Sequence, residues 1–264
     1  MSRRRSDDEW AARARSFGAV ARDYDRARPS YPEALADDVV AALPGPEILE
    51  VGAGTGKASL LFAVRPVALT CLEPDAGMAE VLRENAAPFP NAEIVVSAFE
   101  DWQPTKLYDG IIAAQSWHWT APEHRYRKAA EALRVGGKLA LFWNGSRWDE
   151  TPQASLIDDV YRRHGIKRDD RPGRSKDRSD WPRDELEKLS SFADVEVRTY
   201  FSAQTYTAQE WCDYAASTSE HLILDPPRNA ALLADLRRAI ERSGGMVELA
   251  RRCDLFLATR QPDR

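Results

Sequence analysis

The sequence predicts an α/β fold built on a doubly wound, mostly parallel sheet of seven strands. Short apolar runs recur from residue 47 onward, separated by helical segments: EILEV, VALTCLE, EIVVS, YDGIIAA and KLALFW. Apolar strands that alternate with helices are typical of a parallel sheet covered on both faces, and right-handed crossovers make it doubly wound. Two later runs, DVEVRTYFSAQTY and CDLFLATR, are separated by long helical segments, which favours an antiparallel edge.

Composition and charge narrow the class of protein. The chain has 264 residues, of which 43% are hydrophobic and 30% are charged, as in one globular domain with additions. The formal net charge of −5 gives no positive field for a polyanion, so nucleic acid is not an expected partner. No apolar run approaches the roughly 20 residues of a membrane span, and none follows the basic start MSRRRS as in a secretory signal. We therefore expect a cytoplasmic protein.

The three cysteines and four histidines show no pairing at metal-ligand spacing. An odd cysteine count without a C-x-x-C pair indicates neither a disulfide framework nor a zinc site. We expect reduced, packed cysteines and no metal.

The periodicity divides the chain into four parts. Residues 7–24 place apolar side chains at three- and four-residue steps, which predicts an amphipathic helix ended by RPSYP; a second helix runs from Pro32 to about Leu43. We predict an N-terminal helical lid over residues 1–46 and a core over 47–143. A polar and helical insertion over 144–192 precedes a C-terminal completion of the sheet with helices over 193–264. Residues 144–181 lack apolar periodicity, so we expect an insertion over the sheet or a partly mobile loop.

The stretch ILEVGAGTGKAS, residues 48–59, could belong to three kinds of nucleotide site. The phosphate-loop pattern G-x-x-x-x-G-K-[ST] fails at Val51 and Ala58. The dinucleotide pattern G-x-G-x-x-G fails at Lys57, where it needs its third glycine. A compressed G-x-G-x-G turn between a strand and a helix remains.

Such a turn suits a cofactor with an amino-acid tail. Glycines allow positive φ and close approach of a ligand, and the N–H groups of the first helical turn can bind a carboxylate. Glu73 ends the next strand, where its carboxylate could accept from both hydroxyls of a ribose. A dinucleotide site would use the same acid, so Glu73 alone does not discriminate.

Five segments resemble, in order and spacing, the motifs of the class I S-adenosylmethionine-dependent methyltransferases. They are EVGAGTG, CLEPDAGM, SAFEDW, YDGIIAAQSWHW and LRVGGKLALFW. The resemblance spans residues 47–143 and extends more loosely to the C-terminus. FGAVARDYDRARPSYP, SWHWT and DLFLATR are similar to small-molecule methyltransferases of the trans-aconitate methyltransferase type, but the insertion after Asn144 matches nothing in that group.

The resemblance implies S-adenosyl-L-methionine as cofactor, covered by the N-terminal helix. The implied cofactor-binding residues are Tyr24, Arg28, Glu50, Gly52, Ala53, Gly54, Gly56, Glu73, Pro74, Ala98, Phe99, Glu100 and Gln115. Ala98 would hold the adenine through its backbone and Phe99 through its ring, while Glu100 could accept from a nearby donor. Core packing explains Phe99 equally well.

The acceptor side follows the fourth and fifth strands. The substrate candidates are Trp117, His118, Trp119 and Trp143. Methyl transfer from a sulfonium is an in-line displacement, so alignment does much of the work. His118 is the candidate catalytic base, because its ordinary pKa lies near neutrality; packing or hydrogen bonding to substrate is the alternative.

Two other functions remain open. One is an NAD-dependent oxidoreductase, which the missing glycine at Lys57 disfavours. The other is a non-catalytic S-adenosylmethionine-binding regulator, because a fold does not establish chemistry. Our main expectation is transfer of a methyl group to a carboxylate or hydroxyl of a small molecule. We also expect the Lys57 side chain to point outward and His164 to be exposed. The oligomeric state is not predicted.

Overall fold

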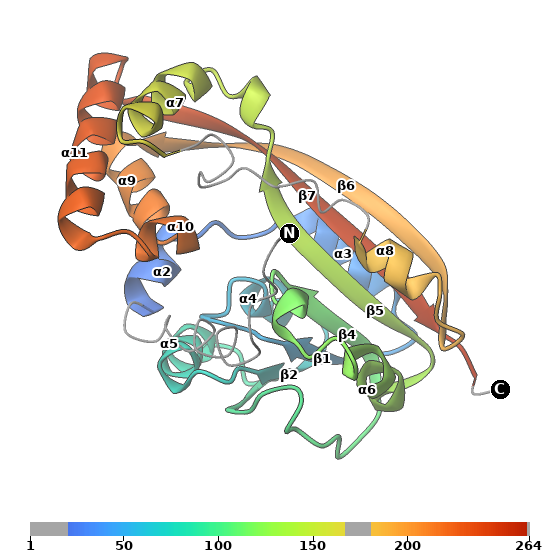
Figure 1. Cartoon of the computed structure of the whole chain (residues 1–264). Helices are drawn as coiled ribbons and strands as arrows, with labels where there is room; N and C mark the ends of the chain where they lie inside the picture. The colour runs from blue at the N-terminus through green and yellow to red at the C-terminus, as the bar shows by residue number, and fades with distance from the viewer. Residues whose placement is uncertain (1–20, 167–180, 263–264) are drawn as a thin grey trace.

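A seven-stranded sheet runs through the molecule (Figure 1). The computed structural model describes residues 21–166 and 181–262. The strand order is β3-β2-β1-β4-β5-β7-β6; β1 to β5 pair in parallel, and β7 is antiparallel to both β5 and β6. The strands are β1 Glu47–Val51, β2 Ala68–Leu72, β3 Ala92–Val95, β4 Tyr108–Ala114, β5 Leu133–Ser146, β6 Phe192–Thr207 and β7 Met246–Arg260. The predicted sheet and its antiparallel edge are confirmed.

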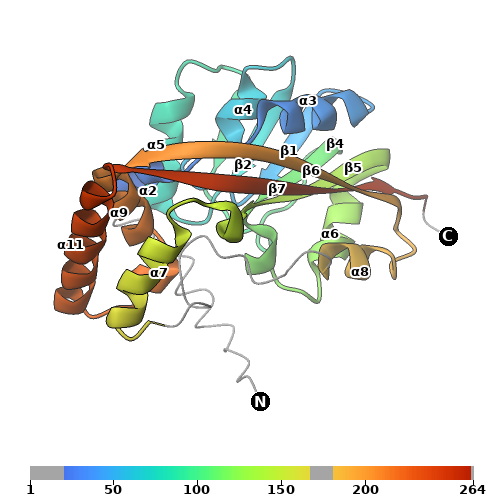
Figure 2. The same cartoon turned by 90° about the horizontal axis from the view of Figure 1, so that it is seen from above.

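Helices cover both faces of the sheet, as a doubly wound fold requires (Figure 2). The helices are α2 Ala21–Ala27, α3 Glu33–Ala42, α4 Ser59–Ala63, α5 Ala76–Ala86, α6 Arg125–Ala132, α7 Ala154–Arg163, α8 Trp181–Leu186, α9 Ala208–Ala216, α10 Ser219–Leu222 and α11 Pro226–Arg242. Short 3₁₀ turns are η2 Trp117–Trp119 and η3 Trp148–Glu150. α3, α4 and α5 lie on one face, and α6 and α8 on the other.

Local capping explains where the helices begin and end. Asp75 caps α5 by accepting from the Met78 N–H at 2.9 Å, and a capping box of Thr207 and Glu210 begins α9. α11 begins at Pro226, because proline suits a first turn. α6 ends at Ala132, directly before β5.

Two apolar layers flank the parallel strands. Alternate side chains of β1 enter them: Leu49 packs with the aromatic layer under α6, and Ile48 packs with α3 and α4. Because both faces are covered, the open edge available to a ligand is the one formed by the carboxyl ends of the parallel strands.

A third apolar cluster joins α7, α9 and α11 at the far end of β6 and β7 (Figure 1). We call these helices, with α10, the C-terminal helical cluster. Ile157, Val160 and Tyr161 of α7 are buried in it. Their i, i+3, i+4 spacing gives this part of the predicted insertion an apolar helical face. The expectation that residues 144–181 lack apolar periodicity is therefore wrong over Ala154–Arg163, whereas residues 167–180 lie outside the described part of the chain.

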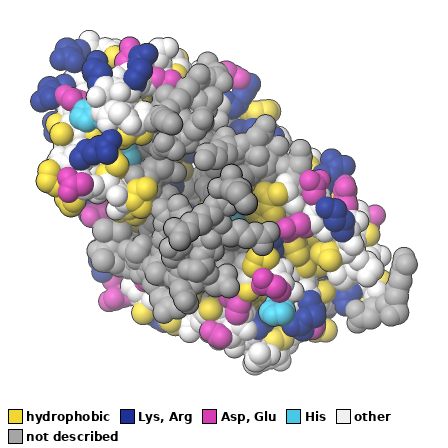
Figure 3. All heavy atoms as spheres, viewed as in Figure 1, with side chains coloured by type: hydrophobic (Ala, Val, Ile, Leu, Met, Phe, Trp, Pro, Cys, Tyr) yellow, Lys and Arg dark blue, Asp and Glu magenta, His cyan; other side chains and the backbone are white. Residues whose placement is uncertain are grey.

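The described surface mixes charges of both signs, as the face in Figure 3 shows. Within residues 21–166 and 181–262, no helix is long and apolar enough to cross a bilayer.

Candidate functional site

The glycine turn between β1 and α4 is built from three residues at positive φ, namely 69° at Gly52, 59° at Gly54 and 97° at Gly56. A Cβ on Gly52 would lie 2.6 Å from the Ser116 Cβ, and one on Gly56 would lie 2.6 Å from the Leu82 Cδ1. A Cβ on Gly54 would meet no atom within 4 Å. Gly52 and Gly56 thus allow close packing, whereas Gly54 borders open space.

Glu73 lies against this turn, directly after β2. One carboxylate oxygen accepts from the Gly54 N–H at 2.7 Å and the other from the Asp75 N–H at 2.9 Å. Burial raises the pKa of Glu73 to about 7, although these backbone donors oppose the rise. The carboxylate is therefore fixed beside Gly54.

Glu50 lies beneath the turn, on the face covered by α3 and α4. Its side chain is fully buried, and the Cys71 thiol is 3.8 Å from its carboxylate. Burial raises the pKa of Glu50 to about 8. Glu50 supports the turn from below rather than lining its open side.

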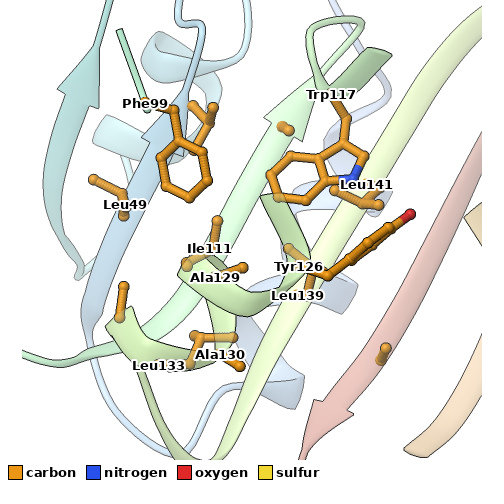
Figure 4. Close-up of a cluster of buried hydrophobic side chains, with 14 of the residues drawn as sticks. Leu49, Phe99, Ile111, Trp117, Tyr126, Ala129, Ala130, Leu133, Leu139 and Leu141 are labelled. Carbon is orange, nitrogen blue, oxygen red and sulfur yellow. The ribbon is translucent and has the colours of Figure 1, made fainter. Parts of the chain in front are cut away.

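The segment after β3 contains the residues expected at the adenine. The Ala98 carbonyl accepts from the Trp102 N–H at 3.0 Å, and the Glu100 carboxylate accepts from the Ala121 N–H at 2.6 Å. The Phe99 ring is only 3% exposed and packs against Trp102 and, as Figure 4 shows, lies in the same apolar layer as Trp117. This burial favours core packing, the alternative for Phe99, over a contact of its ring with adenine.

Trp117 also belongs to the core. It is fully buried, with its ring 5.8 Å from Phe99 and 5.5 Å from Tyr126 between centroids (Figure 4). Its indole fills the layer under α6, so packing accounts for Trp117 better than the expected contact with substrate does.

The other three substrate candidates lie together at the ends of β4 and β5. The Trp143 Nε1–H donates to His118 Nδ1 at 3.4 Å, and the His118 and Trp119 ring centroids are 4.9 Å apart. Trp143 packs edge-on against Trp181, at 5.6 Å between centroids. Because Nδ1 accepts from Trp143, the neutral imidazole carries its proton on Nε2.

Gln115 forms the strained link between β4 and this aromatic group. Its φ of 60° is rare for a residue other than glycine. Its side-chain amide donates to the Asn144 carbonyl at 3.3 Å, and the next side chain, Ser116, donates to the Val51 carbonyl. Strain that the surroundings enforce is common at functional sites.

The chain after α2 is attached to the glycine turn and to β5. Lys57 Nζ lies 3.2 Å from Asp25 Oδ1, the Ser30 hydroxyl donates to the Lys57 carbonyl at 3.3 Å, and Asn144 donates to the Ser30 carbonyl at 3.1 Å. The expectation that Lys57 points outward is wrong, because Asp25 pairs with it. Sequence reasoning missed Asp25, Ser30 and Asn144, whose contacts bridge distant segments.

Tyr24 and Arg28 join α2 to α5 and α9. Tyr24 packs against a small apolar cluster that includes Met78 of α5. The Arg28 guanidinium lies 5.0 Å above the Tyr24 ring and 5.9 Å from the Tyr214 ring, and it donates to the Ser217 carbonyl at 2.9 Å. Residues 7–20 of the expected lid helix lie outside the described residues.

Three further residues were singled out from the sequence, namely Ala53, Pro74 and His164. Ala53 is buried and its N–H donates to the Leu72 carbonyl at 2.9 Å, whereas Pro74 is exposed. His164, expected to be exposed, is half-buried and lies 2.8 Å from an oxygen of Asp235.

The known proteins that this chain resembles are named as methyltransferases. Residues 48–137 match the family model described as a methyltransferase domain. An uncharacterized methyltransferase of Mycobacterium bovis is 34% identical over 130 residues, which are 49% of this chain and 52% of that protein. A Saccharomyces cerevisiae protein named as an S-adenosylmethionine-dependent methyltransferase is 26% identical over 70% of this chain and 69% of its own.

A solved structure shares the fold. It is that of a proposed type II methyltransferase from Anaeromyxobacter dehalogenans, with a TM-score of 0.64 and 21% identity over 89% of this chain and 99% of that chain. The chain spans about half the length of the first curated relatives it matches.

Proposed function

We propose that this chain is a class I S-adenosylmethionine-dependent methyltransferase, which uses the cofactor of that family to transfer a methyl group to a small-molecule acceptor. The observation that carries the proposal is the pairing of Gly54 with Glu73. Open space borders Gly54, and the Glu73 carboxylate is fixed 2.7 Å from its N–H. A ligand with vicinal hydroxyls can approach the backbone there and meet a carboxylate acceptor.

The cofactor would lie along the carboxyl ends of β1, β2 and β4. Glu73 would accept from its ribose hydroxyls, and the backbone of residues 98–100 would border its adenine, with Phe99 packed behind. Tyr24 and Arg28, held between α5 and α9, would cover the methionine end. The ion pair of Lys57 with Asp25 supports this proposed lid, because it attaches α2 to the glycine turn.

The reaction needs alignment more than a covalent intermediate. The cofactor would supply a methyl carbon to which an acceptor oxygen bonds, and the electron pair of the broken carbon–sulfur bond would stay on sulfur. The positive charge on sulfur is thereby lost. Holding the reactants in line can lower the barrier by several kcal/mol, a part of the effect that proximity supplies.

His118 would orient the acceptor. Since Nδ1 accepts from Trp143, the neutral ring presents an Nε2–H donor. Such a ring can hold an acceptor oxygen, but it can take a proton only if the tautomer changes. The geometry therefore favours His118 as a hydrogen-bond donor over a general base, which suits a carboxylate that is already ionised.

Small size of the acceptor is supported by the aromatic side chains around His118. Trp119 and Trp143 border it, and Trp181 covers Trp143. Convergent polar groups within aromatic walls are typical of small-molecule sites. We propose a carboxylate or hydroxyl as the methylated group, in line with the resemblance to the trans-aconitate methyltransferase type.

Calorimetry with S-adenosylmethionine, S-adenosylhomocysteine and NAD tests the cofactor. We expect the two sulfur compounds to bind and NAD not to bind. Mass spectrometry of acceptor mixtures, searching for a gain of one methyl group, then separates an enzyme from a regulator. Tight NAD binding without a response to the sulfur compounds would make the chain an oxidoreductase, and cofactor binding without methylation of any acceptor class would favour the regulator.

A further inference from the structure

Two arginines approach the same tyrosine between the sheet and the C-terminal helical cluster. Arg251 belongs to β7, and Arg28 follows α2. The Arg251 guanidinium lies 5.4 Å from the Tyr214 ring and the Arg28 guanidinium 5.9 Å from it. These segments are far apart in the sequence, so the fold itself brings the two cations together.

Arg251 is a buried cation. Its relative exposure is 6%, its Nη2 donates to the Tyr206 hydroxyl, and its guanidinium lies 5.8 Å from the Tyr206 ring. The Nε atoms of Arg251 and Arg28 are both buried without a hydrogen-bond partner. Burial raises the pKa of Tyr206, while the positive charges of Arg251 and Arg28 oppose that rise, which indicates that both act on one phenol.

No acidic side chain of residues 21–166 or 181–262 forms an ion pair with Arg251 or Arg28. An arginine cannot discharge by losing its proton, and burying an uncompensated charge is costly. Cation–π contacts with Tyr206 and Tyr214 offset only part of that cost.

Arg125 shows how the same chain buries an arginine for structural reasons. It is 5% exposed and pairs with the carboxylate of Glu185, and its guanidinium lies 4.7 Å over the Trp181 ring. Both Arg125 and Arg251 have aromatic neighbours, but only Arg125 has an acid. The difference indicates that the counter-ion of Arg251 comes from outside the described residues.

The position of Arg251 connects it to the proposed site. In the β5–β7 pairing it lies opposite Ser146, just beyond the Trp143 that contacts His118. Arg28 lies in the segment whose Ser30 contacts both Lys57 and Asn144. Arg251 therefore lies at the carboxyl end of β5, on the edge of the sheet where the cofactor is proposed to bind, and Arg28 lies beside it.

We propose that Arg251, with Arg28 beside it, binds an anionic group of the methyl acceptor, either a carboxylate or a phosphate. This inference rests on the proposed function, because it names the class of acceptor for the same site. A planar guanidinium matches two oxygens of either anion, and Tyr206 and Tyr214 provide apolar walls that strengthen the attraction.

Arg251 would act as an anchor rather than as a part of the chemical step. Oxygen atoms whose lone pairs accept from a guanidinium are poorer nucleophiles, so the methyl group would go to another oxygen of the acceptor. That oxygen gains the methyl group, and the sulfur keeps the electron pair of the broken bond; a carboxylate oxygen carries no proton, whereas a hydroxyl releases its proton to water. We therefore expect acceptors that carry an anion and a second oxygen nucleophile, such as dicarboxylates, hydroxy acids or phosphorylated alcohols.

Binding to the protein saturated with S-adenosylhomocysteine tests the proposal without a known acceptor. Calorimetry compares malonate with malonamide, succinate with succinamide, and glycerol phosphate with glycerol at one ionic strength. We expect an anion to bind and its neutral counterpart not to bind; the carboxylate and phosphate arms identify the anion. Arg251→Gln should weaken that binding about tenfold or more, as losing a charged hydrogen-bond partner does, and leave S-adenosylhomocysteine affinity unchanged.

Arg252→Gln is the matched control, because it removes the same charge from the next residue, which pairs with Asp254 and is more exposed. It should change neither affinity. Arg251→Lys, which keeps the charge but not the planar fork, should bind the anion with intermediate affinity and serves if the glutamine variant does not fold. Equal binding of neutral and anionic probes, no binding of any anion, or loss of cofactor rather than anion affinity in Arg251→Gln would overturn the inference. Failure of the wild-type protein to bind S-adenosylhomocysteine would instead overturn the proposed function.

Discussion

The glycine turn and the arginine pair are two ends of one proposed site, but they are assembled differently. At the turn, Gly54 and Glu73 follow neighbouring strands, and backbone geometry fixes both of them. At the arginine pair, Arg28, Tyr206, Tyr214 and Arg251 come from a helix end, an edge strand, a C-terminal helix and the last strand. Local backbone rules thus determine the cofactor end, whereas long-range packing determines the acceptor end.

Alanine substitutions in the turn should give the largest effect and sharpen this contrast. Gly52→Ala forces an alanine into positive φ and places its Cβ 2.6 Å from the Ser116 Cβ. Strain of about 1 to 2 kcal/mol and overpacking of about 1 to 3 kcal/mol should lower the free energy of unfolding by about 2 to 5 kcal/mol. Urea denaturation followed by circular dichroism measures this loss.

Gly54→Ala is the matched variant, because it has the same backbone strain without a neighbouring atom. It should lose only about 1 to 2 kcal/mol of stability, yet it should weaken cofactor binding because the new methyl group enters the open space. Equal losses of stability in the two variants would show that Ser116 yields readily. Unchanged cofactor affinity in Gly54→Ala would remove that space from the site.

The mostly parallel sheet and the turn could be predicted because each strand, glycine and closing acid has a local signature. The burial of Phe99 and Trp117 could not be predicted, since an aromatic residue after a strand looks the same in sequence whether its ring enters the core or the site. Lys57 was misplaced because its partner, Asp25, lies in α2, a segment distant in the sequence. α7 was hidden by the polar residues around Ile157, Val160 and Tyr161. The arginine pair has no sequence signature, because nothing in the sequence distinguishes Arg251 from the more exposed Arg252. Arg251 is buried only because β6 and α9 pack around it.

Glu73→Ala should weaken S-adenosylmethionine binding by about 1 to 3 kcal/mol, the range for hydrogen bonds to a charged group. Glu73→Gln keeps the shape and one acceptor oxygen, so it should lose less. Calorimetry of both variants against the wild type measures the difference. An unchanged affinity in Glu73→Ala would exclude the carboxylate from the site.

The pH dependence of cofactor affinity gives an independent check on the role of Glu73. Burial raises the pKa of Glu73 to about 7 in the free protein, and hydroxyl donors of a ribose favour the ionised form. Cofactor affinity should therefore rise as the pH increases through 7, and this step should vanish in Glu73→Gln. The contribution of Glu73 to folding has the opposite sign: it is present below the unfolded pKa and is lost as pH rises through the folded value. A fall in affinity between pH 6 and 8, measured by calorimetry, would contradict the assignment.

Variants of His118 and Trp143 test the role of the aromatic group that is proposed to lie between the glycine turn and the arginine pair. If His118 is a hydrogen-bond donor to the acceptor, His118→Ala should chiefly raise KM. Trp143→Phe removes the N–H that donates to His118 but keeps an aromatic ring. It should raise KM by a smaller factor, about two- to tenfold for the loss of one hydrogen bond. With a hydroxyl acceptor that needs a base, His118→Ala should instead abolish most turnover and remove an acidic-side pKa from the rate profile. Steady-state kinetics over pH distinguish these cases, and unchanged kinetics in His118→Ala would leave the ring as packing.

The smallest effect concerns the ion pair between Asp25 and Lys57, which attaches α2 to the glycine turn. Both side chains are partly buried, at 21% and 29% exposure, so their coupling should exceed that of an exposed pair but stay near 1 kcal/mol. A double-mutant cycle of Asp25→Asn and Lys57→Met on cofactor affinity measures it. The pair of Arg22 with Glu84 is the matched control, because it also attaches α2, to α5, but is 63% and 46% exposed. Its cycle should give a coupling near zero that added salt removes. If the Asp25 cycle gave no more coupling than the Arg22 cycle, the contact with the turn would not hold α2 in place, and the lid would depend on Tyr24 and Arg28 alone.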